Sequence, residues 1–200
     1  NVLHHTAKLP ASKSISNRVL VIHALTGGHT LPSNLSDCDD TEVIVEALNH
    51  NPYEINIKAA GTAMRFMTAY LSVMRGTHVL TGTARMKQRP IGILVDALRK
   101  LGADIEYMGQ EGYPPLRITG LALKGGELEI EGNVSSQYIS ALLMIGPVLE
   151  KGLELKLAGD IISRPYIDLT LWMMREYGAD AEWTSADTIS VKPKPYVNRS

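Results

Sequence analysis

Basic side chains stand where the sequence predicts helices to begin. Lys13 and Arg18 flank the start of one predicted helix, and Arg65 falls in the first turn of a second. Helix N-termini carry partial positive charge, so a basic residue there costs roughly 0.3–1 kcal/mol. Basic residues also stand at two Arg-Pro pairs further along the chain. Arg85, Lys87 and Arg89 lead up to Pro90, and Arg164 precedes Pro165.

A bound anion would make these placements favourable. A phosphate accepts hydrogen bonds from free backbone N–H groups, from Ser and Thr hydroxyls and from basic side chains at once. Charge-assisted hydrogen bonds contribute roughly 1.5–3 kcal/mol each, which exceeds the penalty from the helix dipole. In the alternative interpretation, each basic side chain extends into solvent and each Ser or Thr is an ordinary N-cap. The number of such placements favours a phosphate-binding site.

Composition argues against several other kinds of chemistry. The 200 residues carry 20 basic and 21 acidic side chains, so no overall field attracts nucleic acid or a membrane surface. The apolar stretches are shorter than the roughly 18 residues that span a bilayer, and no signal peptide opens the chain, which predicts a cytoplasmic protein. Cys38 is the single cysteine, and the histidines lack metal-ligand spacing. Asp37, Asp39 and Asp40 are interpreted as ordinary helix-start residues, so we expect neither metal nor cofactor.

A repeated pattern indicates how these helix starts are arranged. Three stretches each contain a small-residue turn with Ser or Thr, an uncharged apolar helix, a Gly and a short strand, and then a second helix. In the last two copies the second helix begins with Arg-Pro and ends with Gly-Ala-Asp, over Arg89–Asp104 and Arg164–Asp180. Leu153–Leu157 alternates apolar and polar residues and is predicted to be a strand. The unit is βαβαββ, with copies at about 9–57, 58–131 and 132–193.

The two helices of each copy differ in kind. The first is uncharged over long stretches, such as residues 66–74 and 138–149, and a helix that is apolar all round is buried all round. The second is amphipathic: Ile91, Leu94, Val95, Leu98 and Leu101 form one stripe, which predicts an outer position. We therefore expect three parallel buried helices with their starts at one end. The helix after Arg89 is expected to begin at Pro90, because proline is accommodated at the first helical position.

Five blocks of sequence resemble the signature segments of the 5-enolpyruvylshikimate-3-phosphate synthase family of enolpyruvyl transferases. They occur in the family's order and together extend over nearly the whole chain: Leu9–Arg18, Ala60–Arg65, Arg85–Gly92, Val134–Gln137 and Ser163–Asp168. The resemblance implies an α+β (α/β) fold in which three βαβαββ repeats surround buried parallel helices. This would be one domain, residues 9–193, of a two-domain fold described as an inside-out α/β barrel. Residues 1–8 and 194–200 would be hinge or crossover segments toward a second domain that these residues do not include.

The resemblance also implies a reaction and its substrates. The family transfers the enolpyruvyl group of phosphoenolpyruvate to the 5-hydroxyl of shikimate 3-phosphate, in aromatic amino acid biosynthesis, without metal or cofactor. Its proton-transfer groups lie in the second domain, so the 200 residues are expected to bind substrates without turnover. The chain begins at Asn1 and ends in a Pro-rich run, which we interpret as a trimmed protein or a fragment.

Specific residues are implied in substrate binding. Lys13, Gly61 and Arg89 would contact phosphoenolpyruvate, Gln137 would reach both substrates, and Tyr166 would line the pocket. Shikimate 3-phosphate would be held by Ser14, Arg18, Ser135, Ser136 and Ser163. Thr62, Arg65 and Arg164 are further candidates in the same blocks.

Two other functions remain open from the sequence. A sister enolpyruvyl transferase acting on a UDP-sugar shares the fold, although the Ser-Ser-Gln and Arg-Met-Lys-Gln-Arg-Pro blocks favour the shikimate enzyme. The chain could instead be a non-catalytic repeat domain that binds phosphorylated metabolites.

Overall fold

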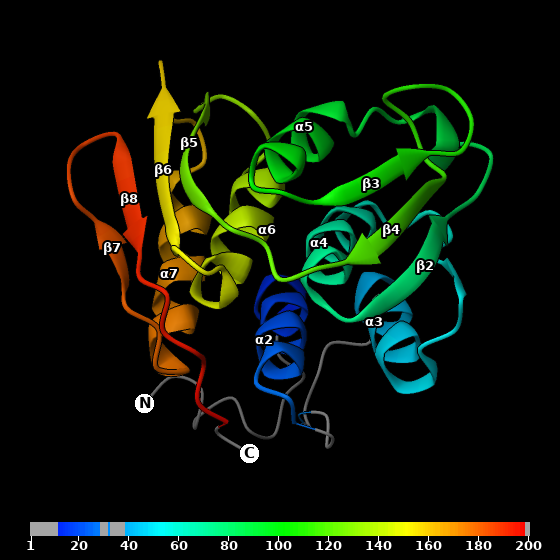
Figure 1. The fold of residues 1–200 in the computed structure, drawn as a ribbon, viewed down its shortest axis with the longest axis horizontal. Coiled ribbons are helices and arrows are strands. Elements are labelled where there is room, and N and C mark those ends of the chain that lie inside the picture. The colour runs from blue at the N-terminus through cyan, green and yellow to red at the C-terminus, as the bar shows by residue number, and fades with distance from the viewer. Residues whose placement is uncertain (1–11, 29–31, 33–38, 199–200) are drawn as a thin grey trace.

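The computed structural model describes residues 12–28, 32 and 39–198. The expected hinge at 1–8, the beginning of the first signature block, and the residues Asp37 and Cys38 lie outside these ranges. Within them the chain forms six α-helices and two four-stranded sheets (Figure 1).

The first sheet and its helices form one βαβαββ unit. The order along the chain is β1, α4, β2, α5, β3 and β4, with β1 and β2 parallel and the other neighbours antiparallel. The strands lie in the order β1-β2-β4-β3 across the sheet. The bounds are Glu54–Asn56 for β1, Gly61–Val73 for α4, Gly76–Thr81 for β2, Gly92–Lys100 for α5, Asp104–Tyr107 for β3 and Leu116–Gly120 for β4.

The second sheet repeats this arrangement with the same strand order. Strands β5 and β6 are parallel, β6 pairs antiparallel with β8, and β8 with β7. The bounds are Gly126–Glu131 for β5, Ser136–Ile145 for α6, Leu153–Ala158 for β6, Arg164–Glu176 for α7, Ala181–Trp183 for β7 and Thr188–Val191 for β8. The βαβαββ interpretation is confirmed for these two units, and β6 coincides with the predicted strand. Their first strands, β1 and β5, lie before the copy starts expected at 58 and 132.

Helix α2 (Lys13–Leu25) packs with α4 and α6 in the interior, as Figure 1 shows at the centre of the molecule. Leu20 and Ile22 of α2, Phe66 of α4 and Leu142 of α6 are fully buried, and the uncharged apolar stretches of these helices leave no face that favours water. Helix α3 (Asp39–His50) follows α2 and packs against it and α4. The expectation of buried first helices is therefore confirmed.

The amphipathic helices lie outside this group. The stripe predicted for α5 is buried at all five positions, while Ile93 on another face is exposed. Helix α5 begins at Gly92, however, and the expected start at Pro90 is wrong. The backbone N–H of Ile91 donates to the carbonyl of Gly112 at 2.8 Å, and Ile91 has φ −133°, so a contact with the β3–β4 loop holds this residue outside the helix.

Among the described residues, no helix is long and apolar enough to cross a membrane.

Candidate functional site

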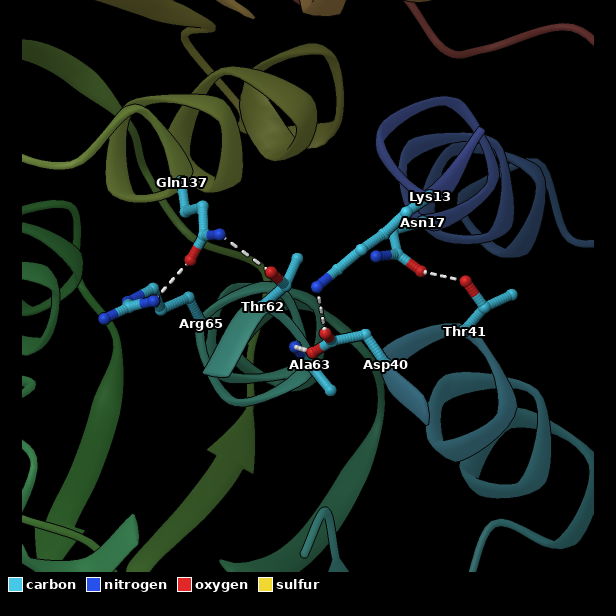
Figure 2. Close-up of polar contacts among 8 residues, drawn as sticks. All are labelled: Lys13, Asn17, Asp40, Thr41, Thr62, Ala63, Arg65 and Gln137. Atoms are coloured by element: carbon cyan, nitrogen blue, oxygen red, sulfur yellow. Dashed lines mark hydrogen bonds and ion pairs between the residues drawn. The ribbon is translucent and has the colours of Figure 1, made fainter. Parts of the chain in front are cut away.

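The starts of α2, α3 and α4 are joined through the carboxylate of Asp40. Its Oδ2 lies 2.7 Å from Nζ of Lys13, the first residue of α2, and its Oδ1 accepts from the backbone N–H of Ala63 at 3.2 Å (Figure 2). Ala63 belongs to the first turn of α4, whose N-cap residue Ala60 offers no side-chain acceptor. Asp40 therefore supplies from α3 the cap that α4 lacks.

Gln137 joins the start of α6 to the start of α4. Its Nε2 donates to Oγ1 of Thr62 at 2.8 Å, and its Oε1 accepts from the guanidinium of Arg65 (Figure 2). Together with the contacts of Asp40, this places the starts of α2, α3, α4 and α6 at one end of the molecule. The expectation that the buried helices begin at a common end is confirmed for the described residues.

The segment before α5 also reaches this end. A Cβ added to Gly61 would lie 2.7 Å from Nη1 of Arg89, so the guanidinium of Arg89 rests against the backbone at the start of α4. Tyr138 of α6 donates from its hydroxyl to the carbonyl of Pro90 at 3.0 Å, and the guanidinium of Arg65 lies over its ring at 5.1 Å. Lys13, Gly61, Thr62, Arg65, Arg89 and Gln137 are thus brought together.

Arg18 lies beneath this group and is only 3% exposed. Its Nε donates to Oγ1 of Thr170 at 2.7 Å, its Nη2 to Oγ of Ser140 at 3.0 Å, and its Nη1 to the carbonyl of Ser14 at 3.1 Å. Burial lowers the pKa of Arg18 to about 10, so the side chain remains charged at neutral pH. A buried charge with neutral partners favours the approach of an anion.

The predicted serines stand at helix starts. Ser135 is the N-cap of α6, where its Oγ accepts from the backbone N–H of Gln137 at 3.2 Å, and Ser136 is the first helical residue. Ser163 is the N-cap of α7 and forms no capping bond through its side chain. Tyr166 is 51% exposed in the first turn of α7, and its carbonyl accepts from Thr170, the residue that holds Arg18.

The side chain of Arg164 lies against the region of β7 and β8 and not against this group of residues. Its guanidinium stacks on the ring of Trp183 at 4.0 Å and donates to the carbonyl of Ala186 at 2.9 Å, near the turn between β7 and β8. In this structure Arg164 is therefore not brought to the group formed by Lys13, Arg89 and Gln137.

Acidic residues are scarce at these helix starts. Five of the six described α-helices have no Asp or Glu in the first turn, and the exception is α3, which contributes Asp40. These helix N-termini have no acidic residue in the first turn. Together with the basic side chains and hydroxyl groups, they provide hydrogen-bond donors and positive charge for a phosphate or carboxylate ligand. A groove of about 860 Å³ opens beside them and is lined by Lys13 and Lys58, but also by the acidic residues Asp39, Asp40, Glu42, Glu46 and Glu54.

Several polar residues of this region were not predicted. Asp40 was interpreted as an ordinary helix-start residue, and Ser140 and Thr170 sit inside helices with no motif around them. Asn17 is fully buried; its Oδ1 accepts from the hydroxyl of Thr41 at 2.7 Å, and its Nδ2 has no hydrogen-bond partner among the described residues. No spacing along the chain signals these partners, because each contact joins different helices. Among the described residues, no group of acidic, His or Cys side chains could hold a metal ion.

Comparison with known proteins gives one consistent family. The family model described as EPSP synthase (3-phosphoshikimate 1-carboxyvinyltransferase) matches residues 48–200. A 3-phosphoshikimate 1-carboxyvinyltransferase of Bacteroides fragilis is 64% identical over 191 residues, which cover 96% of this chain and 47% of that protein. The chain spans about half the length of the curated relatives it matches.

Solved structures show the same fold. An EPSP synthase from Acinetobacter baumannii superposes with a TM-score of 0.79 at 24% identity, covering 94% of this chain and 47% of that one. The enolpyruvyl transferase NikO from Streptomyces tendae superposes with a TM-score of 0.60 at 17% identity, covering 94% of this chain and 49% of that one. The α+β domain therefore matches half of these structures.

Proposed function

The chain belongs to the EPSP synthase (3-phosphoshikimate 1-carboxyvinyltransferase) family, and we propose that it binds shikimate 3-phosphate and part of phosphoenolpyruvate for enolpyruvyl transfer. In that reaction the 5-hydroxyl of shikimate 3-phosphate loses its proton and adds to C2 of phosphoenolpyruvate, while C3 gains a proton and becomes a methyl group. Loss of phosphate from C2 together with a proton from that methyl group then restores the double bond and leaves the enolpyruvyl ether. The contribution of these residues is to bind and orient two anionic substrates.

One observation carries the proposal: the starts of α2, α4 and α6 meet with basic side chains and without acids in their first turns. In the free protein Lys13 pairs with Asp40 and Arg65 donates to Gln137, but both basic side chains lie near partially positive helix ends, where a cation is disfavoured. An anionic substrate reverses the sign of these interactions and is held by backbone N–H groups as well.

The residues divide between the two substrates. We assign Lys13, Gly61 and Arg89 to phosphoenolpyruvate, since Arg89 rests against Gly61 and both lie near the start of α4. Gln137, at the start of α6, contacts Thr62 and Arg65 of α4 and is assigned to both substrates. Thr62 and Arg65, its partners, orient it. The residues assigned to shikimate 3-phosphate are Ser14, Arg18, Ser135, Ser136, Ser163 and Tyr166.

The finer architecture is also part of the proposal. Residues 9–193 would form one domain of three βαβαββ units, the first of which contains α2 and α3, with hinge segments at 1–8 and 194–200. A second domain would close over the helix starts and supply the proton-transfer groups. The protein would work in the cytoplasm without a cofactor. The family match favours this function over the alternatives of a UDP-sugar transferase and a non-catalytic binding domain.

Calorimetric titration of the chain with shikimate 3-phosphate tests the proposal. We expect saturable binding by the wild type, no binding of shikimate that lacks the phosphate, and a loss of roughly tenfold or more in Arg18→Met, as for a charge-assisted bond. Methionine fills the buried volume without the charge, so it perturbs packing less than alanine.

Arg99→Met is the control for losing an arginine elsewhere. Like Arg18, which lies over the ring of Phe66 at 5.4 Å, Arg99 stacks on a ring, that of Tyr107, and donates to a backbone carbonyl, that of Ile105 at 2.6 Å, but it is exposed and lies in the last turn of α5. Its variant should bind like the wild type. Absence of heat with the wild type at millimolar ligand would overturn the proposed function.

A further inference from the structure

The guanidinium of Arg18 is fixed by two hydroxyl groups from two other helices. Thr170 of α7 accepts from Nε, and Ser140 of α6 accepts from Nη2. Both residues are fully buried. Among the described residues no carboxylate contacts Arg18, so these neutral acceptors hold a charge that would otherwise lose its hydration without compensation.

The directions of these hydrogen bonds follow from the chemistry of the groups. Arg18 can only donate, and the carbonyl of Tyr166 can only accept. Thr170 lies 2.9 Å from that carbonyl and 2.8 Å from Oγ of Ser140. When Thr170 donates to the carbonyl of Tyr166, its oxygen accepts from Arg18 and from Ser140. In this arrangement both hydroxyl protons have an acceptor.

This arrangement links the predicted substrate residues. It begins at Arg18 on α2, passes through Ser140, which lies one turn after Ser136 on α6, and ends at the carbonyl of Tyr166 in the first turn of α7. Three helix starts are thereby held in register around one guanidinium. The terminal nitrogens of Arg18 each keep a second N–H that these bonds do not use.

We propose that Thr170 and Ser140 are positioning residues for Arg18, which they hold in the orientation that receives the phosphate of the substrate. The inference rests on the proposed function, because it assigns Arg18 to shikimate 3-phosphate. Without the two acceptors the guanidinium gains rotamer freedom, and binding must then order it again.

Helix α4 offers matched hydroxyls that contact no arginine. Thr68 is fully buried and donates to the carbonyl of Met64 at 2.6 Å, as Thr170 donates to Tyr166 four residues earlier. Ser72 is fully buried and donates to the carbonyl of Thr68 at 2.8 Å. Substitutions at Thr68 and Ser72 therefore report the cost of losing a buried helical hydroxyl alone.

The experiment compares Thr170→Val with Thr68→Val, and Ser140→Ala with Ser72→Ala, in the 200-residue chain. Calorimetry measures the Kd for shikimate 3-phosphate, thermal unfolding measures stability, and NMR measures hydrogen exchange of the Nε–H of Arg18. Thr170→Val and Ser140→Ala should each raise the Kd between about three- and tenfold, as for one newly mobile side chain. The α4 variants should leave the Kd unchanged at a similar loss of stability.

The following results distinguish the positioning role from a loss of stability and from failure of the proposed function. Slow exchange of the Arg18 Nε–H should be lost in Thr170→Val and retained in Thr68→Val, and Thr170→Ser should restore both slow exchange and affinity. If the wild type binds and Thr170→Val binds equally well with its Nε–H still protected, the positioning role is refuted while the proposed function stands. If the wild type does not bind, the proposed function fails and the positioning role fails with it. If Thr170→Val does not fold, Ser140→Ala decides by the same Kd comparison.

Discussion

At the start of α3, one carboxylate contacts two other helices with different energetic consequences. The ion pair of Asp40 with Lys13 involves a lysine side chain that is 53% exposed. Pairs of this kind contribute only about 0–1 kcal/mol, because water and salt screen them. The bond from the backbone N–H of Ala63 is different, since Ala63 is fully buried and that N–H would lose its acceptor without Asp40. The cap, more than the ion pair, should decide the stability of this junction.

Two substitutions at Asp40 separate these contributions. Asp40→Asn keeps an oxygen that can accept from Ala63 and removes the charge, so the free energy of unfolding should fall by less than about 1 kcal/mol. Asp40→Ala removes both interactions and should lower it by about 1–3 kcal/mol, the cost of a buried unsatisfied N–H group. Urea unfolding followed by circular dichroism measures both. The exposed neighbour Asp39 serves as the control through Asp39→Ala, and equal losses in the two Asp40 variants would contradict the assignment.

At the residue scale, the sequence predicted several of the side chains that gather, although not the different position of Arg164, and it did not predict what holds them. Lys13, Arg89 and Gln137 were found because their types conflict with helix starts or match family blocks. Asp40 gave no such signal, since an acid at a helix start is ordinary. Ser140 and Thr170 gave none either, because a hydroxyl inside a helix usually bonds its own backbone. Contacts between helices distant in sequence cannot be seen in local patterns.

At the scale of the elements, stability and anion binding favour different residues at the helix starts. An acid in the first turn stabilises a free helix by about 0.3–1 kcal/mol, yet α2, α4, α5, α6 and α7 have none there. A site for anions explains the omission, since an acid would repel the ligand. The omission therefore implies that inserting an acid improves stability and harms binding.

Ser136→Asp tests this opposition at the first residue of α6. The variant should unfold at the same or a higher temperature than the wild type, and its affinity for shikimate 3-phosphate should fall by roughly fivefold or more, since like charges in contact repel by about 1 kcal/mol even in water. Ser136→Asn is the neutral control of similar size and should lose less affinity. Thermal unfolding and calorimetry on the same samples give both values. Equal affinity of the two variants would show that no anion binds at this helix start.

Most elements of the two complete units could be predicted because their periodicities are simple. The uncharged sequences of α4 and α6 indicated burial, and the stripe on α5 indicated an outer position. The start of α5 could not be predicted, because both Arg-Pro pairs look alike in sequence. Arg164 begins α7 directly, whereas Ile91 is held by Gly112 in the β3–β4 loop, a contact made only after folding.

Considered as a whole molecule, the chain matches about half the length of its curated relatives. Within the described residues, the side chains assigned to the substrates are hydrogen-bond donors and cations, such as Lys13, Arg18 and Arg89. Such groups bind and orient anions, whereas enolpyruvyl transfer also requires a group that moves protons to and from the methylene carbon of the enolpyruvyl group. No assigned residue is a carboxylic acid, and the carboxylate of Asp40 beside them contacts Lys13 and Ala63.

These 200 residues alone should therefore bind the substrates without turning them over. Purified chain mixed with shikimate 3-phosphate and phosphoenolpyruvate is expected to release no phosphate above the rate without protein. Adding the part of the Bacteroides fragilis relative that lies outside the matched region should restore release, because this chain is 64% identical over 191 residues to the part it would replace. An Arg18→Met chain mixed with the same part is the control and should release less phosphate, since it binds shikimate 3-phosphate weakly. Phosphate release by the wild-type chain alone would show that the described helix starts already contain the proton-transfer group.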